Sequence, residues 1–127
     1  MLYLFIGEDS FSKELKLKKL KEESFAKEVA QFNLDVLYAK ELTLKQLQEK
    51  LLCLPVKAKK RLIVIKDAQA LKEDTQKFIL EFCKNPYPQA TLVLDANQSE
   101  PKNEFINRIR RYARVLHFQE TTRLNTF

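Results

Sequence analysis

The sequence predicts an α/β fold, a three-layer α/β/α arrangement around a five-stranded parallel sheet. Five short apolar segments alternate along the chain with four longer segments that have helical character. Strand–helix–strand units form right-handed crossovers, which make the joined strands parallel. The strand segments are continuously apolar, which is typical of strands buried on both faces of a sheet.

The first strand is expected at residues 3–6, an apolar run that Gly7 ends. Asp9 or Ser10 can cap the helix that follows, which is expected at residues 11–31. An apolar face and a lysine-rich outer face are expected for this helix. The apolar face consists of Phe11, Leu15, Leu20 and Phe25.

The middle of the chain contains two further strand segments, at residues 34–38 and 62–65. Between them, Thr43 is expected to cap a helix whose leucines recur at helical spacing. This helix is expected to end near Cys53, because Pro55 disfavours helical geometry in the residue before it.

The last part of the chain repeats the pattern. A helix with its apolar face at residues 71–82 precedes a fourth strand at 91–94. A last amphipathic helix, marked by apolar residues from Phe105 to Ala113, precedes a fifth strand at 115–118. These elements complete one domain at residues 1–120, and residues 121–127 read as a tail or the start of a linker.

Composition limits the classes of function. The 127 residues are 45% hydrophobic, enough for a core without metal or disulfide support. No apolar run approaches the ~18–20 residues of a membrane span, and no secretion signal precedes the first strand, so a cytoplasmic location is expected. We expect no metal site and no cofactor, because His117 is the only histidine and no Cys-x-x-Cys motif exists.

The charge balance favours acidic partners. Lys and Arg total 23 against 17 Asp and Glu, which gives a formal net charge of +6. Nucleic acid is the commonest acidic partner of such a chain.

The junction after the first strand resembles a phosphate-binding loop in part. In the pattern GxxxxGK[ST], Gly7 and Lys13 match, whereas Ser12 replaces the second glycine and Glu14 replaces the magnesium-binding hydroxyl. Its position between a strand and a helix is that of a ligand site in α/β proteins.

The chemistry of this junction does not suit a polyphosphate. Its additional carboxylates, Glu8, Asp9 and Glu14, would each repel a phosphate group at ~4 Å by roughly 1–4 kcal/mol. Lys66 stands where a nucleoside triphosphatase holds its magnesium-linked Asp, although Asp67 could substitute. We therefore expect a structural remnant of the loop in a domain that is not an enzyme.

Four ordered segments resemble the bacterial DNA polymerase III delta subunit family: residues 3–11, 32–35, 54–66 and 91–94. The resemblance spans nearly all of this chain but only the first domain of the family's three-domain proteins. It implies a P-loop NTPase fold of the AAA+ type with strand order 5-1-4-3-2 that does not bind nucleotide. It also implies a non-catalytic part of the clamp loader in the DNA-directed DNA polymerase holoenzyme.

The resemblance further implies a partner and a contact site. Family members bind and open the sliding clamp, the beta subunit, during DNA replication, through a turn that here consists of Leu54, Pro55, Val56 and Lys57. Val56 stands where the family commonly has Phe, a loss of apolar area worth about 1 kcal/mol. Other clamp-loader subunits would bind through domains absent here, and DNA could be contacted within the complex.

Alternative interpretations remain at this stage. The apolar residues of the turn could belong to the core, and the basic cluster after it, Lys59, Lys60 and Arg61, could be a solvated loop instead of an electrostatic contact. The chain could also be a divergent P-loop ATPase that uses Lys13 and Asp67, or a basic nucleic-acid-binding module.

Overall fold

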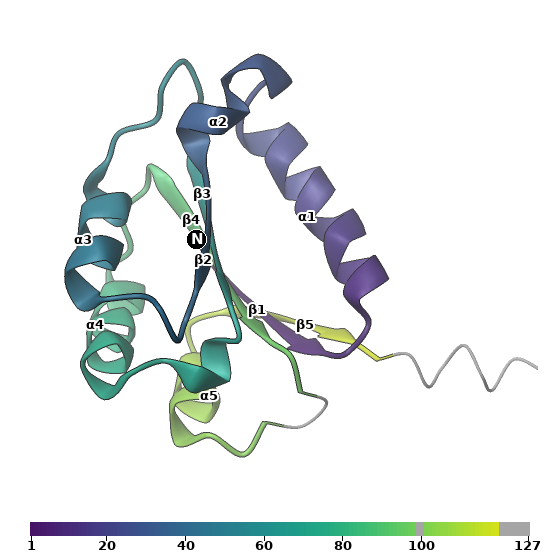
Figure 1. The fold of residues 1–127 in the computed structure, drawn as a ribbon, viewed down its shortest axis with the longest axis vertical. Coiled ribbons are helices and arrows are strands. Elements are labelled where there is room, and N and C mark those ends of the chain that lie inside the picture. The colour runs from purple at the N-terminus through teal and green to yellow at the C-terminus, as the bar shows by residue number, and fades with distance from the viewer. Residues whose placement is uncertain (99–100, 120–127) are drawn as a thin grey trace, which may run out of the picture.

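The computed structural model describes residues 1–98 and 101–119 and contains a five-stranded sheet in the order β2-β3-β4-β1-β5 (Figure 1). Every pair of neighbouring strands is parallel. The predicted strand order is confirmed, since 5-1-4-3-2 is the same order read from the other edge. The strands are β1 (Leu2–Gly7), β2 (Leu34–Tyr38), β3 (Arg61–Lys66), β4 (Ala90–Ala96) and β5 (Arg114–Phe118).

Helices cover both faces of the sheet, as predicted. Figure 1 shows α1 (Ser10–Ser24) on one face, and α3 (Leu44–Leu52), α4 (Glu73–Lys84) and α5 (Glu104–Ile109) on the other. The short helix α2 (Ala30–Asn33) leads into β2. Two 3₁₀ turns, η1 (Lys27–Val29) and η2 (Ala68–Ala70), complete the connections. The tail at residues 121–127 lies outside the described residues.

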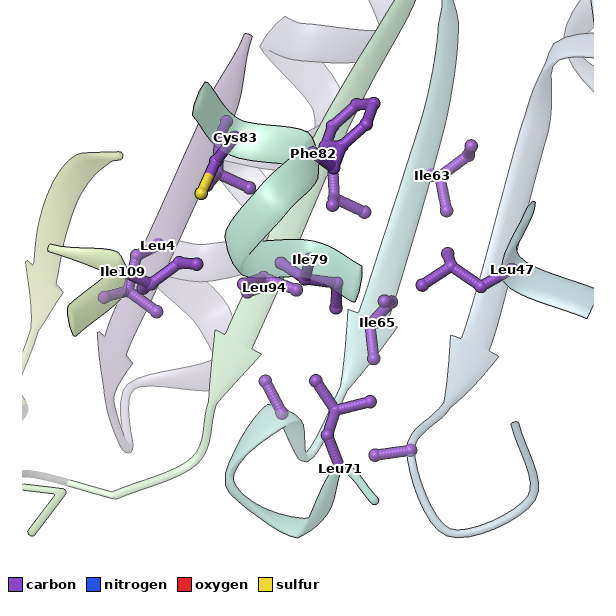
Figure 2. Close-up of a cluster of buried hydrophobic side chains, with 14 of the residues drawn as sticks. Leu4, Leu47, Ile63, Ile65, Leu71, Ile79, Phe82, Cys83, Leu94 and Ile109 are labelled. Carbon is purple, nitrogen blue, oxygen red and sulfur yellow. The ribbon is translucent and has the colours of Figure 1, made fainter. Parts of the chain in front are cut away.

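The core has two parts, one on each face of the sheet. The larger part packs Leu4, Ile63 and Leu94 of the strands against Ile79 and Phe82 of α4 (Figure 2). The smaller part packs Phe5, Val64 and Val93 against Leu17 and Leu20 of α1. The central strands β1, β3 and β4 therefore have apolar residues on both faces, which explains their continuous hydrophobicity.

The edge strand β2 differs from this pattern. Its Val36 and Tyr38 are exposed, because an edge strand has a neighbour on one side only. The expectation of burial on both faces thus fails for β2.

The expected helix at residues 11–31 is wrong in length and in its buried face. It ends at Ser24, because Phe25 adopts an extended conformation (φ −159°, ψ 157°) and packs into the smaller core. Phe11 and Leu15 are 67% and 51% exposed, and the buried positions of α1 are Lys13, Leu17, Leu20 and Ser24. Apolar spacing mispredicted the orientation of this helix, because a lysine occupies a core-facing position.

The other helix boundaries follow local chemistry. Thr43 caps α3 through a capping box with Gln46, and the helix gives way to extended backbone at Cys53, both as predicted. The last helix is shorter than expected, because α5 ends at Ile109 and leaves Tyr112 and Ala113 outside it. Within the described residues, no helix is long and apolar enough to span a membrane.

Gly7 is required by the packing of the sheet. Its φ of +129° lies in a region that L side chains rarely adopt, and a Cβ would collide with the main-chain carbonyl of Phe118. The same carbonyl accepts a hydrogen bond from the Asp9 N–H at 3.0 Å. The close approach of β5 is thus sufficient to account for this glycine.

Candidate functional site

The residues predicted for the phosphate-loop remnant meet at the carboxyl edge of the sheet. Lys13 and Glu14 of α1, Lys66 at the end of β3, and the adjacent Asp67 line a hollow of about 230 Å³. A further lining residue, Asp95 at the end of β4, was not predicted from the sequence. The topology therefore brings the two parts of the predicted remnant together.

A buried ion pair joins α1 to the sheet. The Lys13 ammonium donates to Asp95 Oδ1 and to the main-chain carbonyl of Gly7, both at 2.6 Å. Lys13 is 3% exposed and Asp95 is 5% exposed. This lysine is directed into the protein and has two short hydrogen bonds there.

Asp95 also contacts the second lysine of the remnant. Lys66 Nζ lies 3.3 Å from Asp95 Oδ2 and 3.6 Å from Glu14 Oε1. The two ammonium groups and the two carboxylates carry charges that cancel. Asp67 follows in a left-handed conformation (φ 55°). The hollow therefore lacks the surplus of positive charge that would attract a polyphosphate.

The start of α1 is capped by its own chain. The Asp9 carboxylate accepts hydrogen bonds from the Ser12 N–H at 3.2 Å and the Ser12 hydroxyl at 2.6 Å. An active phosphate loop offers such amide groups at a helix N-terminus to the ligand. Here a protein carboxylate that is 4% exposed takes that place, and it would repel a phosphate.

Asp95 could not be recognised as a site residue from spacing along the chain. It lies 82 residues from Lys13, and it is one acidic residue at the end of an apolar run. Only the sheet register places it beside Lys66 on one side and Phe5 on the other. Its one sequence signal is a carboxylate in a segment that otherwise reads as buried.

The turn between α3 and β3 lies at the opposite edge of the sheet from this remnant (Figure 1). Leu54 is 73% exposed and Val56 is 42% exposed, while Pro55 is half-buried and Lys57 is exposed. The apolar side chains of the turn are therefore not part of the core. Large apolar side chains exposed together on a turn are typical of a protein contact site.

The backbone of this turn is held by Asn33, the last residue of α2. The Asn33 side-chain amide donates to the Val56 carbonyl at 2.8 Å, and its oxygen accepts from the Val56 N–H at 2.7 Å. A second donation, to the Val29 carbonyl at 2.9 Å, completes its bonding. Asn33 is fully buried and was not predicted as a site residue from the sequence.

The basic cluster after the turn is divided by burial. Arg61 is only 6% exposed, forms an ion pair with Asp35, and donates to the Phe32 carbonyl at 2.7 Å. Its guanidinium connects β3 to β2, so of the three basic residues considered as electrostatic contacts Arg61 is the one bonded inside the protein. Lys59 is exposed and Lys60 is half-buried, so both remain accessible.

The two cysteines differ in accessibility. Cys53, which immediately precedes the turn, is exposed, whereas Cys83 on α4 is buried. Burial raises the pKa of the Cys83 thiol. We expect alkylating reagents to reach the exposed Cys53 thiol faster than the buried Cys83 thiol.

The buried Lys13–Asp95 pair predicts an asymmetric response to substitution. Asp95→Ala leaves the buried Lys13 ammonium without its counter-charge, and the free energy of unfolding should fall by about 3–5 kcal/mol. Replacing both partners, in Lys13→Met/Asp95→Leu, should cost less, because no buried charge is left alone. Urea denaturation followed by circular dichroism measures both effects.

The exposed pair of Lys77 and Glu73 on α4 provides the control for this experiment. Lys77→Ala should change the free energy of unfolding by less than about 0.5 kcal/mol. A loss below about 1 kcal/mol for Asp95→Ala would show that the buried pair does not stabilise the fold as described.

Comparison with solved structures shows the same fold in two bacterial proteins. The Bacillus subtilis DNA clamp loader delta protein matches with a TM-score of 0.80 and 17% identity, over 94% of this chain and 38% of that one. A DNA polymerase III gamma subunit-related protein from Thermotoga maritima matches with a TM-score of 0.69 and 13% identity, over 93% and 40%. The chain thus spans about two-fifths of the length of either protein.

Comparison of the sequence alone gives a family. No curated protein sequence matches the chain. The family model described as "DNA polymerase III, delta subunit" matches residues 3–119, which include the phosphate-loop remnant and the exposed turn. The chain therefore belongs to the DNA polymerase III delta subunit family.

Proposed function

We propose that this domain binds the sliding clamp as part of a clamp-loader delta subunit, and that Leu54 and Val56 make the contact. The observation that carries the proposal is the exposure of these two apolar side chains on a turn whose backbone is hydrogen-bonded to a buried side chain. Membership of the DNA polymerase III delta subunit family supports a partner within the replication complex, and the sliding clamp is the partner that we propose. Contacts with other clamp-loader subunits would be made by parts of the protein outside this chain.

The proposed mechanism is differential binding without covalent chemistry. A ligand shifts a conformational equilibrium only by its difference in affinity for the two states. Insertion of Leu54 and Val56 into an apolar pocket that is accessible only when the clamp interface is distorted would favour the open ring. Val56 buries less apolar area than a Phe would, so Leu54, the more exposed of the two, is expected to contribute more.

The basic residues near the turn would assist the encounter. Lys57 and Lys59 are exposed, and Lys60 is half-buried. Like-charged groups around an apolar contact raise the association rate with an acidic surface more than they raise affinity. We assign these three lysines to guidance toward an acidic region of the clamp.

We also propose that the phosphate-loop remnant is structural. Lys13 is held by Asp95 and the Gly7 carbonyl, Lys66 replaces a magnesium ligand, and the Asp9 carboxylate caps α1. An ATPase that uses Lys13 and Asp67 would have to withdraw Lys13 from the interior and leave Asp95 without its closest cation. The buried geometry therefore supports the non-catalytic interpretation.

Equilibrium titration with ATP and Mg²⁺ tests this interpretation. The chain should bind no ATP up to millimolar concentrations, because the carboxylates of the hollow repel the triphosphate and its two lysines, Lys13 and Lys66, are already paired with carboxylates. Isothermal calorimetry measures the affinity directly. Saturable binding that Lys13→Ala abolishes in a folded variant would establish the ATPase alternative and contradict the structural assignment.

The turn is tested by charge substitution in a clamp-binding assay. Leu54→Asp/Val56→Asp should reduce affinity for the sliding clamp of the same source by roughly 30- to 150-fold. This range corresponds to about 2–3 kcal/mol of lost apolar burial. Surface plasmon resonance with immobilised clamp gives the dissociation constants.

The solvent face of α1 supplies a matched control for the turn. Phe11→Asp/Leu15→Asp introduces the same charge at two other exposed apolar residues and should leave clamp affinity unchanged within about threefold. Equal losses in both double variants would indicate a charge effect and not a contact site. Binding to DNA that falls steeply with salt, and that survives Leu54→Asp/Val56→Asp, would favour the nucleic-acid-binding module.

A further inference from the structure

We propose that Asn33 is a positioning residue that fixes the conformation of the Leu54–Val56 turn before any partner binds. The inference rests on the proposed clamp contact and adds a residue that makes no contact with the clamp itself. It is based on the bonding of Asn33, on the backbone of the residues around the turn, and on the exposure of the side chains that the turn presents.

The bonding of Asn33 is specific to a side-chain amide. Its oxygen accepts the Val56 N–H while its nitrogen donates to the Val56 carbonyl, so both main-chain polar groups of one residue are engaged. The third bond, to the Val29 carbonyl, requires the nitrogen at that position and sets the orientation of the amide. Asp could accept the N–H but could not donate to either carbonyl, and Ala could do neither.

The segments next to Asn33 and Val56 are also fixed. Arg61 pairs with Asp35 and donates to the Phe32 carbonyl, which joins the start of β3 to the start of β2 on either side of Asn33. Lys57, directly after Val56, adopts a positive φ of 50°. A non-glycine residue in this region is held there by its surroundings, and such residues concentrate at functional sites.

The result is a turn with a fixed backbone and exposed apolar side chains. The main-chain groups of Val56 bond the fully buried Asn33 side chain in the protein interior. The Val56 side chain remains 42% exposed. Leu54, two residues earlier, is 73% exposed. A loop that becomes ordered only on binding loses conformational entropy, which lowers its affinity. A loop that is already ordered in the free protein avoids this cost.

The inference predicts that loss of Asn33 weakens clamp binding through the turn. Asn33→Ala in the full chain should weaken clamp affinity about tenfold and should speed hydrogen exchange of the Val56 amide at least tenfold. Asn33→Asp retains the size but places a carboxylate oxygen against the Val29 and Val56 carbonyls, so it should weaken clamp affinity at least as much. All affinities are measured below the unfolding transition of each variant, with circular dichroism confirming the fold.

Thr43→Ala is the matched control. It removes the capping box of α3, the helix that leads into the turn, and it does not touch Val56. It destabilises the domain without releasing the turn backbone, so clamp affinity should stay within twofold of wild type. A second comparison places Asn33→Ala in a Leu54→Ala/Val56→Ala background, where it should cost little further affinity.

The outcomes separate the inference from the proposed function. If the wild-type chain does not bind the clamp, the proposed function fails and the role of Asn33 fails with it. If the wild type binds and Asn33→Ala binds equally well despite faster Val56 exchange, the positioning role is overturned and the clamp contact stands. Unchanged Val56 exchange in both Asn33 variants, or a full tenfold loss in the Leu54→Ala/Val56→Ala background, also overturns the positioning role.

Discussion

The structure at the carboxyl edge of the sheet depends on the ion pairs of the buried Asp95 carboxylate. This carboxylate accepts from Lys13 of α1 on one oxygen and lies near Lys66 of β3 on the other, so one anion connects three elements. This pairing explains why α1 turns a lysine toward the sheet and leaves Phe11 and Leu15 in solvent. Asp95 also neutralises the lysines that a nucleotide site would need for binding phosphate. The Asp9 carboxylate accepts the Ser12 N–H at the start of α1, an amide that a phosphate would otherwise bind. Under the proposed structural role, the protein's own charged and polar groups fill the place where related α/β proteins bind a ligand.

The amino edge of the sheet shows the opposite arrangement. There the buried polar groups, Asn33 and Arg61, satisfy main-chain atoms and Asp35, and the apolar side chains of the turn point outward. Leu54 and Val56 thus lie on a rigid support at the end of the sheet farthest from the phosphate-loop remnant. One end of the sheet therefore exposes apolar side chains, and the other end carries paired charges. This arrangement is consistent with a protein that binds a partner and carries out no covalent chemistry.

Apolar segments and helix caps were sufficient to predict most of the fold. The strands, the Thr43 cap and the end of α3 at Cys53 all follow from local chemistry, whereas the strand order came from the family resemblance. The orientation of α1 was missed because Lys13 is buried beside a partner 82 residues away. Asn33 was missed for the same reason, since its bond to Val56 spans 23 residues. Polar residues that are buried by partners far along the chain leave no periodic signal in the sequence. Lys13 lies at the carboxyl edge of the sheet and Asn33 at the amino edge, and these are the two edges that contain the candidate sites.

Contact between the turn and the clamp can be detected through the reactivity of Cys53 in the unmodified protein. This exposed thiol precedes Leu54, and the buried Cys83 serves as an internal reference in the same molecule. The rate of alkylation at each cysteine is measured by mass spectrometry with and without saturating sliding clamp. We expect the bound clamp to slow alkylation of the exposed Cys53 severalfold, whereas any slowing at the buried Cys83 reflects suppressed unfolding of the domain. A Cys53 rate that the bound clamp does not alter would contradict the proposed contact.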